Sequence, residues 1–292
     1  MQLTQTFKEQ VRTAVLEARK NYGGSDADYS KKLGISSSIY SRLKAGETDK
    51  IISDNTWLTI GRELNVSMKK NNWKIARTTV YNEIESNLLF CQTHSKSMML
   101  VDDCGIGKTF CSQHIIRGLK NAFYVDCSQA KTKQQFIRLI AKTIGVDNQG
   151  KFIDVKSNLK YYLNQLETPL IVLDEAGDLD YTAFLELKEM WNATNGSCGW
   201  YMIGADGLRN KIERGINGKK VGYAEIFSRF SDSFVKLIPV GKEDRQAYYT
   251  QLIGDVATVN STDKSKLKQH INICIKKGST LRHLETLIKA GI

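Results

Sequence analysis

Proline, long apolar runs and paired cysteines are scarce in this chain of 292 residues. Only two prolines occur, which excludes proline-rich spacers. No apolar run approaches the ~18 residues of a membrane span, and the first residues lack the apolar core of a signal peptide, so we expect a cytoplasmic protein with no membrane partner. The six cysteines show no Cys-x-x-Cys spacing, and we interpret them as reduced thiols rather than disulfide partners or zinc ligands.

Acidic residues are also in deficit. The chain has 42 lysines and arginines against 31 aspartates and glutamates, a formal net charge of +11, and the excess is spread along the sequence. The positive electrostatic field of such a chain favours a polyanionic partner such as nucleic acid. The alternative, a soluble protein that is merely basic, stays open. The apolar fraction of 41% and the charged fraction of 25% are ordinary for a folded chain and exclude a wholly disordered one.

The first seventy residues have the spacing of a small helical domain. Apolar residues recur at helical intervals over residues 1–20, and residues 28–44 read as a helix, a tight turn at Gly34 and a second helix. A further helix is predicted near residues 55–64. We therefore predict a helix-turn-helix domain over residues 1–70, with a plain helical hairpin for protein contact as the alternative.

From residue 97 onward, short apolar segments alternate with helical ones. The first four segments are continuously apolar, which suits parallel strands buried on both faces. This alternation predicts a doubly wound α/β core with a parallel sheet over residues 71–240, followed by a small helical domain over residues 241–292. The predicted strands are Ser97–Val101, Ala122–Val125, Leu170–Leu173, Trp200–Ile203 and Phe234–Ile238.

A glycine-rich run follows the first predicted strand. Residues 102–109 read Asp-Asp-Cys-Gly-Ile-Gly-Lys-Thr, close to the phosphate-loop pattern of Gly, four residues, then Gly-Lys-Ser/Thr. Glycines let backbone N–H groups surround phosphate oxygens at a helix N-terminus. Asp102 stands where the first glycine is expected, so its carboxylate must point away from a nucleotide. The residues expected to bind nucleotide are Gly105, Ile106, Gly107, Lys108 and Thr109.

Two adjacent carboxylates end the third predicted strand. Phosphoryl transfer needs one carboxylate that holds hydrated magnesium and another that orients or deprotonates the attacking water. Asp174 suits the first role, together with the Thr109 hydroxyl, and Glu175 suits the second. Lys108 would reach the β- and γ-phosphates. The pair of motifs predicts an enzyme that binds ATP with Mg²⁺ and hydrolyses it.

With these two motifs, the chain from about residue 75 onward resembles the AAA+ ATPases. The resemblance implies a polar sensor after the strand that lies between the two motif strands, and Asp206 is the nearest candidate. It implies that Arg229, in Ile-Phe-Ser-Arg-Phe-Ser-Asp, crosses a subunit interface to the neighbour's γ-phosphate. It also implies that Arg282, in Gly-Ser-Thr-Leu-Arg-His-Leu, points from a helical lid at the nucleotide.

Two regions are candidates for DNA contact. Residues 29–44 resemble a helix-turn-helix of the phage-repressor type, whose second helix would meet a major groove. Two basic segments after strands, 128–133 and 209–220, are predicted as loops that could track a phosphate backbone in an assembly, or could simply be solvated. The candidate DNA-binding residues are Ser37, Ser38, Ser41, Arg42, Lys131, Lys133, Arg214, Lys219 and Lys220.

A helix-turn-helix, a compact ATPase core and a short lid resemble the transposition target-selection helpers of the phage Mu B type. That resemblance implies a homo-oligomer, a helical filament or ring, that assembles on double-stranded DNA with little sequence preference and activates a cognate transposase. It also implies a bacterial or phage-infected cytoplasm. The alternatives are a replication helicase loader or initiator-type ATPase, and a non-enzymatic DNA-binding regulator.

Overall fold

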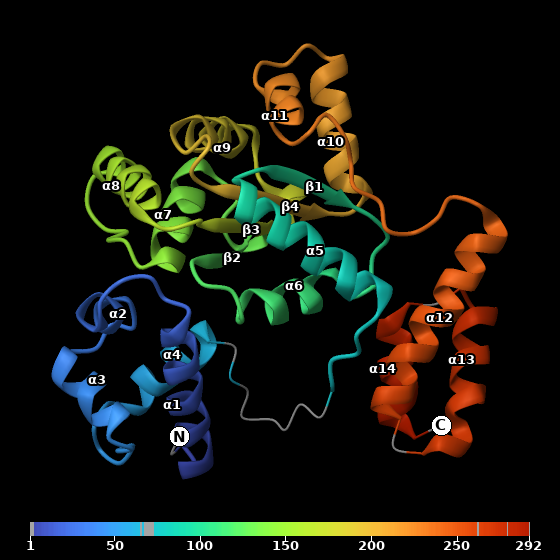
Figure 1. Ribbon diagram of the computed structural model, residues 1–292, viewed down its shortest axis with the longest axis horizontal. Coiled ribbons are helices and arrows are strands. Elements are labelled where there is room, and N and C mark those ends of the chain that lie inside the picture. The colour runs from blue at the N-terminus through green and yellow to red at the C-terminus, as the bar shows by residue number, and fades with distance from the viewer. Residues whose placement is uncertain (1–2, 65, 67–72, 262, 279, 292) are drawn as a thin grey trace.

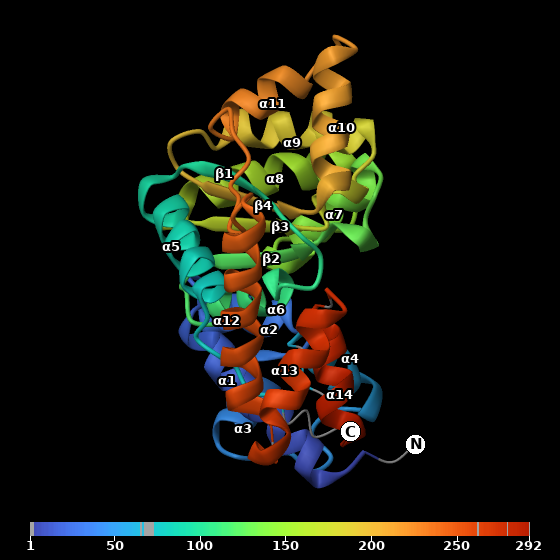
Figure 2. The same cartoon turned by 90° about the vertical axis from the view of Figure 1, so that its right-hand side faces the viewer.

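The computed structural model describes residues 3–64, 66, 73–261, 263–278 and 280–291. The chain forms an α/β core with a helical part at each end, and both helical parts lie below the core in Figures 1 and 2. The predicted boundary between residues 70 and 71 lies outside the described residues. None of the helices in the described ranges is long and apolar enough to cross a bilayer.

The N-terminal part is a bundle of four helices, α1 to α4. Each helix begins after a serine or threonine whose side chain accepts a hydrogen bond from the helix's first turn: Thr4, Ser25, Ser36 and Ser53. Small Ser30 lets α2 and α3 cross closely, and its hydroxyl lies 3.2 Å from that of Ser37. The predicted helix-turn-helix is therefore present as two helices. The bounds are α1 (Gln5–Lys20), α2 (Asp26–Lys32), α3 (Ser37–Lys44) and α4 (Asp54–Glu63).

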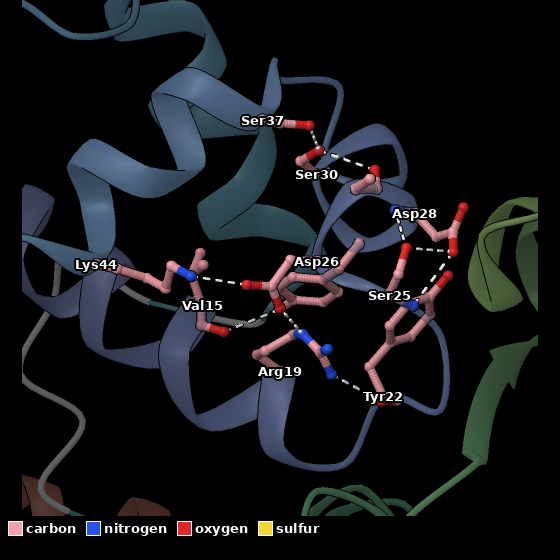
Figure 3. A network of polar contacts seen from close by, with 11 residues as sticks. Val15, Arg19, Tyr22, Ser25, Asp26, Asp28, Ser30, Ser37 and Lys44 are labelled. Carbon is pink, nitrogen blue, oxygen red and sulfur yellow. Dashed lines mark hydrogen bonds and ion pairs between the residues drawn. The ribbon is translucent and has the colours of Figure 1, made fainter.

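One carboxylate ties three of these helices together. Asp26, at the start of α2, accepts a hydrogen bond from Arg19 of α1 at 2.6 Å and from Lys44 of α3 at 2.7 Å (Figure 3). These two cations lower the pKa of Asp26, with the Lys44 bond as the larger cause. The helix-turn-helix is thus fixed against α1 as one unit.

This bundle is seated on the core near the start of β2 (Ala122–Asp126). The backbone N–H of Asn121 donates to the carbonyl of Asn21 at 3.0 Å, and the Asn21 side chain donates to the carbonyl of Arg117. Lys142 and Glu63 form an ion pair at 3.1 Å on the same side. These contacts fix where the exposed face of α3 lies relative to the core.

The core sheet is parallel, with the strand order β1-β4-β3-β2. All residues of β3 (Leu170–Asp174) and β4 (Gly199–Gly204) are buried, as the continuous apolar segments predict. The other strand is β1 (Ser97–Val101). Because β4 lies between β1 and β3, the loops that follow β1 and β3 emerge one strand apart at the carboxyl edge of the sheet.

Helices cover both faces of this sheet, giving three layers. One face packs against α5 (Thr79–His94) and α6 (Lys108–Ile116), and the other packs against α7 (Lys133–Ile144), α8 (Phe152–Gln165) and α9 (Tyr181–Ala193). The apolar core on this second face also includes residues of α10 (Asp206–Asn217) and α11 (Tyr223–Arg229). These two helices lie at the far end from the two helical parts in Figure 1. Two short 3₁₀ turns, η1 (Cys127–Gln129) and η2 (Ala176–Asp178), follow β2 and β3.

The fifth predicted strand is wrong. Over residues 234–238 only Val235 bridges to the sheet, at Leu100. Beyond it, the Asp102 side chain replaces the strand ladder, because its Oδ2 accepts hydrogen bonds from the backbone N–H groups of Leu237 at 2.5 Å and Ile238 at 3.0 Å. A buried carboxylate thus holds the segment that leaves the core for the C-terminal helices.

The C-terminal helices form a small lid with its own core. Ile253, Ala257, Cys274 and Leu284 are buried in this cluster. Asn260 also bonds the backbone of Lys74 at 2.6 and 3.1 Å, joining the far end of the first lid helix to the chain before α5. The lid comprises α12 (Lys242–Asn260), the turn η3 (Lys264–Lys266), α13 (Leu267–Lys276) and α14 (Leu281–Ala290).

We predict that Asp102→Gly, which restores the glycine usual in phosphate loops, destabilises this protein. The change leaves the amides of Leu237 and Ile238 without their acceptor, at a cost of about 2 kcal/mol in the free energy of unfolding. Urea denaturation of the two proteins measures the difference. Asp102→Asn retains an oxygen acceptor and is the matched control, with a smaller expected loss. A glycine variant as stable as the parent would show that the carboxylate anchors nothing.

Candidate functional site

The phosphate loop leaves the carboxyl end of β1 and runs directly into α6. Gly105 and Gly107 have φ angles of +75° and +100°, values that side chains with a Cβ rarely adopt. Ile106 between them is buried and fixes the loop to the core. Gly107 begins α6 without a side-chain cap, so the first N–H groups of the helix remain available to an anion.

Lys108 lies folded into this loop. Its Nζ donates to the carbonyl oxygens of Asp102 at 2.8 Å and Asp103 at 2.6 Å. Burial lowers the pKa of Lys108, opposed by the charges of neighbouring acidic groups. The cation is therefore already positioned in the loop, held by carbonyl groups that phosphate oxygens can replace.

The two predicted motifs meet through a hydrogen bond. Thr109 Oγ1 donates to Asp174 Oδ2 at 2.6 Å, and Tyr124 of β2 donates its hydroxyl to the same oxygen at 2.6 Å. Asp174 is buried. Tyr124 is a positioning residue that the sequence did not reveal, because nothing in the sequence places β2 beside β3.

These donor atoms fit a magnesium ion. Thr109 and Asp174 offer one hydroxyl and one carboxylate, and magnesium takes oxygen ligands while keeping several positions for water and phosphate. Within the described ranges, no group of three or more histidine, cysteine or acidic side chains could hold a metal.

Glu175 follows at the carboxyl edge of the sheet. Its φ of +50° lies in the left-handed region, a strained conformation typical of functional positions, and its N–H donates to Asp174 Oδ1 at 2.9 Å. Burial raises the pKa of Glu175, and the charges of Asp174 and Asp178 add to the rise. A carboxylate with a raised pKa is a better proton acceptor at neutral pH.

The lid rests on the phosphate loop. The N–H of Leu281 donates to the carbonyl of Gly105 at 3.1 Å, and a Cβ added to Gly105 would lie 2.6 Å from the Cβ of Thr280. Asp103 is held by two residues of α12, because its carboxylate accepts hydrogen bonds from Arg245 and, at 2.5 Å, from Tyr249. Sequence reasoning missed these partners, since the pairs lie more than 140 residues apart. The loop and the lid helices together line a cavity of about 480 Å³.

The two predicted sensors are less closely tied to this site. Arg282 is exposed in the first turn of α14, next to the residue that contacts Gly105. Asp206 follows β4, the strand between β1 and β3, as the resemblance implies. Its side chain is 75% exposed and pairs with Arg209 at 3.0 Å. The nucleotide-sensing roles of Arg282 and Asp206 stay predictions.

Arg229 lies at the opposite edge of the sheet from its own phosphate loop. It ends α11 and lines a cavity of about 370 Å³ beside Ser97, the first residue of β1. The five residues of β1 separate the two places by roughly 16 Å at ~3.3 Å per residue. Arg229 is therefore remote from the phosphate loop of the same chain, and its action on a neighbour stays a prediction.

The candidate DNA-binding residues of α3 share one exposed face. Tyr40 and Leu43 are buried beneath it. The hydroxyls on this face make local hydrogen bonds, and the Arg42 guanidinium pairs with Glu47 at 2.7 Å. The exposed residues are Ser37, Ser38, Ser41 and Arg42.

The second group of basic residues requires a correction. The segment 209–220 is not a loop, because most of it forms α10. In this helix the Lys211 ammonium donates to the carbonyls of Gly177 and Leu179, so this lysine holds the turn after β3. Lys131 pairs with Asp178 at 3.4 Å, and the Lys220 ammonium lies 4.0 Å from the ring centroid of Tyr181. Lys133, Arg214 and Lys219 are exposed, and the DNA-binding role of all these residues stays a prediction.

Comparisons with known proteins agree with this geometry. Residues 91–212 match the family described as an AAA domain. The Orc1 protein of Aeropyrum pernix, solved in complex with DNA, is similar in structure, with a TM-score of 0.55 and 16% sequence identity over 75% of this chain. The match covers 60% of the Orc1 chain, and at this identity it shows the fold alone. No curated protein matches the chain in sequence. Residues 91–212 are thus similar to an AAA domain, and the fold of the chain resembles that of Orc1.

We predict that ATP protects Cys104 from thiol reagents. Cys104 is exposed in the phosphate loop, whereas the other five cysteines are buried, so a reagent such as a maleimide should label this position first. Bound phosphates and a seated lid would cover it. Labelling is followed by mass spectrometry with and without ATP and magnesium. In the Lys108→Ala control, ATP should give no protection. Equal labelling rates for the parent at saturating ATP would place the nucleotide elsewhere.

Proposed function

We propose that this protein is an ATPase that binds duplex DNA with little sequence preference and assembles on it as a homo-oligomer. The observation that carries the proposal is the 2.6 Å hydrogen bond between Thr109 and Asp174. It brings the phosphate loop and the carboxylates after β3 into one site, with Glu175 adjacent. This combination serves phosphoryl transfer to water.

Each residue of the site has a part in that reaction. The N–H groups from Gly105 to Thr109 would surround phosphate oxygens, and Lys108 would exchange its carbonyl partners for them. Glu175 would orient the attacking water and accept its proton. Thr109 and Asp174 would hold magnesium, which when bound neutralises charge on the phosphates.

Assembly is proposed from the position of Arg229. A guanidinium at the amino edge of the sheet is remote from its own phosphate loop and available to that of a neighbouring subunit. An arginine supplied in this way stabilises the charge of the transition state and acts only in the oligomer. Nucleotide turnover and assembly would then be coupled, whether the oligomer is a ring or a helical filament.

Duplex DNA is proposed as the partner on three grounds. The chain carries a net charge of +11, the polar face of α3 is exposed on a rigid helix-turn-helix, and the structurally similar Orc1 protein was solved in complex with DNA. Serine hydroxyls discriminate poorly between bases. We therefore infer that backbone contacts dominate and that sequence preference is weak.

Two cellular roles fit this activity. The order of helix-turn-helix, ATPase core and short lid favours transposition target selection, in which the DNA-bound assembly activates a transposase. The structural likeness to Orc1 favours a replication initiator or helicase loader. Assembly on random-sequence duplex supports the first role, and preference for one origin sequence supports the second. A non-enzymatic regulator is disfavoured, because the hydrogen bond between Thr109 and Asp174 joins the two motifs that hydrolysis needs.

We predict that random-sequence duplex DNA stimulates ATP hydrolysis and binds with a steep salt dependence. Neutralising six or more phosphates would lower the affinity about 10³-fold between about 50 and 200 mM salt. Fluorescence anisotropy and a phosphate-release assay measure the two effects. Glu175→Gln, which keeps the size of the side chain, should bind ATP and DNA but hydrolyse ATP about 10²-fold more slowly or worse. A single tight operator with little salt dependence, or normal turnover by Glu175→Gln, would contradict the proposal.

A further inference from the structure

The cavity beside Arg229 is basic, with an aromatic wall. It opens at the amino edge of the sheet, among the turn between α5 and β1, the end of α9 and the end of α11. Its volume is about 370 Å³, and the side chains that matter here are His94, Lys96, Ser97, Trp191 and Arg229. It is distinct from the phosphate loop, which lies at the other end of β1.

Arg229 is held in this cavity by stacking. Its guanidinium carbon lies 5.2 Å from the ring centroid of Trp191, within the range of a cation–π interaction. Its Nη1 is buried and makes no hydrogen bond to any described residue. A buried cationic donor without an acceptor is costly. Trp191 therefore orients the arginine, while its Nη1 donor has no acceptor among the described residues.

Trp191 is itself fixed to β1. Its Nε1 donates to the Ser97 hydroxyl at 2.8 Å, and the Ser231 hydroxyl donates to the Ser97 carbonyl at 2.8 Å. The indole is therefore anchored at the first residue of the strand whose other end carries the phosphate loop. Ser231, two residues after Arg229, ties the end of α11 to the same point.

We propose that Trp191 is a positioning residue that holds Arg229 ready for an anionic group of a neighbouring copy of this chain. This inference rests on the proposed function, in which that group is a nucleotide phosphate. A free arginine side chain samples many rotamers and loses that freedom on binding. The indole face removes part of this loss before binding, because it holds the guanidinium at the cavity that a neighbouring chain would approach. Trp191 contacts no nucleotide and acts only through Arg229.

A mixing experiment isolates this role. Subunits with Lys108→Ala cannot bind nucleotide productively but still supply Arg229, and subunits with Arg229→Ala bind nucleotide but supply no arginine. All turnover in a mixture then comes from Arg229→Ala pockets served by Arg229 of the other subunit. We expect the mixture on DNA to hydrolyse ATP, and a second mixture with Lys108→Ala/Trp191→Leu as donor to be about tenfold slower.

Matched variants keep the test decisive. A donor with Trp191→Phe retains an aromatic face, so the kcat of its mixture should lie between those of the tryptophan and leucine donors. KM for ATP should stay unchanged, because the nucleotide pocket belongs to the other subunit. Ser97→Ala in the donor removes the Nε1 anchor but leaves the indole, and should also lower kcat. If the leucine variant fails to co-assemble, the Ser97→Ala donor still tests whether Trp191 positions Arg229.

The outcomes separate the two proposals. No turnover in the first mixture, despite co-assembly on DNA, overturns the action of Arg229 on a neighbour and with it the proposed coupling of turnover to assembly. Turnover in the first mixture that none of the Trp191 or Ser97 donor variants lowers overturns the role of Trp191 alone. Trp191 would then merely pack against the arginine.

Discussion

The position of β1 at the edge of the parallel sheet, paired with β4 and lying between two layers of helices, is the constraint on which the other features depend. The phosphate loop follows its carboxyl end, and Ser97 at its amino end binds Trp191 and the end of α11. A buried strand of five residues is rigid, because its backbone groups are paired with β4. The strand therefore fixes the separation between the place where a subunit binds phosphate and the place where it presents Arg229.

Two consecutive aspartates connect that strand to the lid by different means. Asp102 is 9% exposed and holds the backbone that leads into the lid, whereas Asp103 holds Arg245 and Tyr249 on the first lid helix. Both lie at the start of the phosphate loop, so a ligand that moves this loop acts on the lid at two points. Asp102 also accepts a hydrogen bond from the backbone N–H of Asp103 at 2.7 Å, so other groups of the protein bind both carboxylates.

Much of the core could be predicted from the sequence because its signals are local. Continuous apolar segments located four strands, and the glycine spacing together with Asp174 and Glu175 indicated the candidate nucleotide site. The expectation that the Asp102 carboxylate points away from a nucleotide stays a prediction, and its Oδ2 binds Leu237 and Ile238. The helical spacing of apolar residues, also a local signal, indicated the N-terminal helices.

The features that sequence reasoning missed depend on distant residues. Tyr124 reaches Asp174 only because β2 pairs with β3, and strand order is not encoded locally. Residues 234–238 have the apolar pattern of a strand, but the Asp102 side chain takes the N–H groups that a strand would pair. The segment 209–220 reads as a polar loop because the apolar residues that bury one side of α10, such as Leu208 and Ile212, are few among charged neighbours.

The most direct measurement is an electron cryomicroscopy structure of the protein assembled on duplex DNA with ATP, using the slow Glu175→Gln variant. The account predicts nucleotide on the phosphate loop of one subunit and Arg229 of the next subunit within hydrogen-bonding distance of its γ-phosphate. Nucleotide sites that face solvent, with Arg229 of every subunit remote from any phosphate, would contradict it.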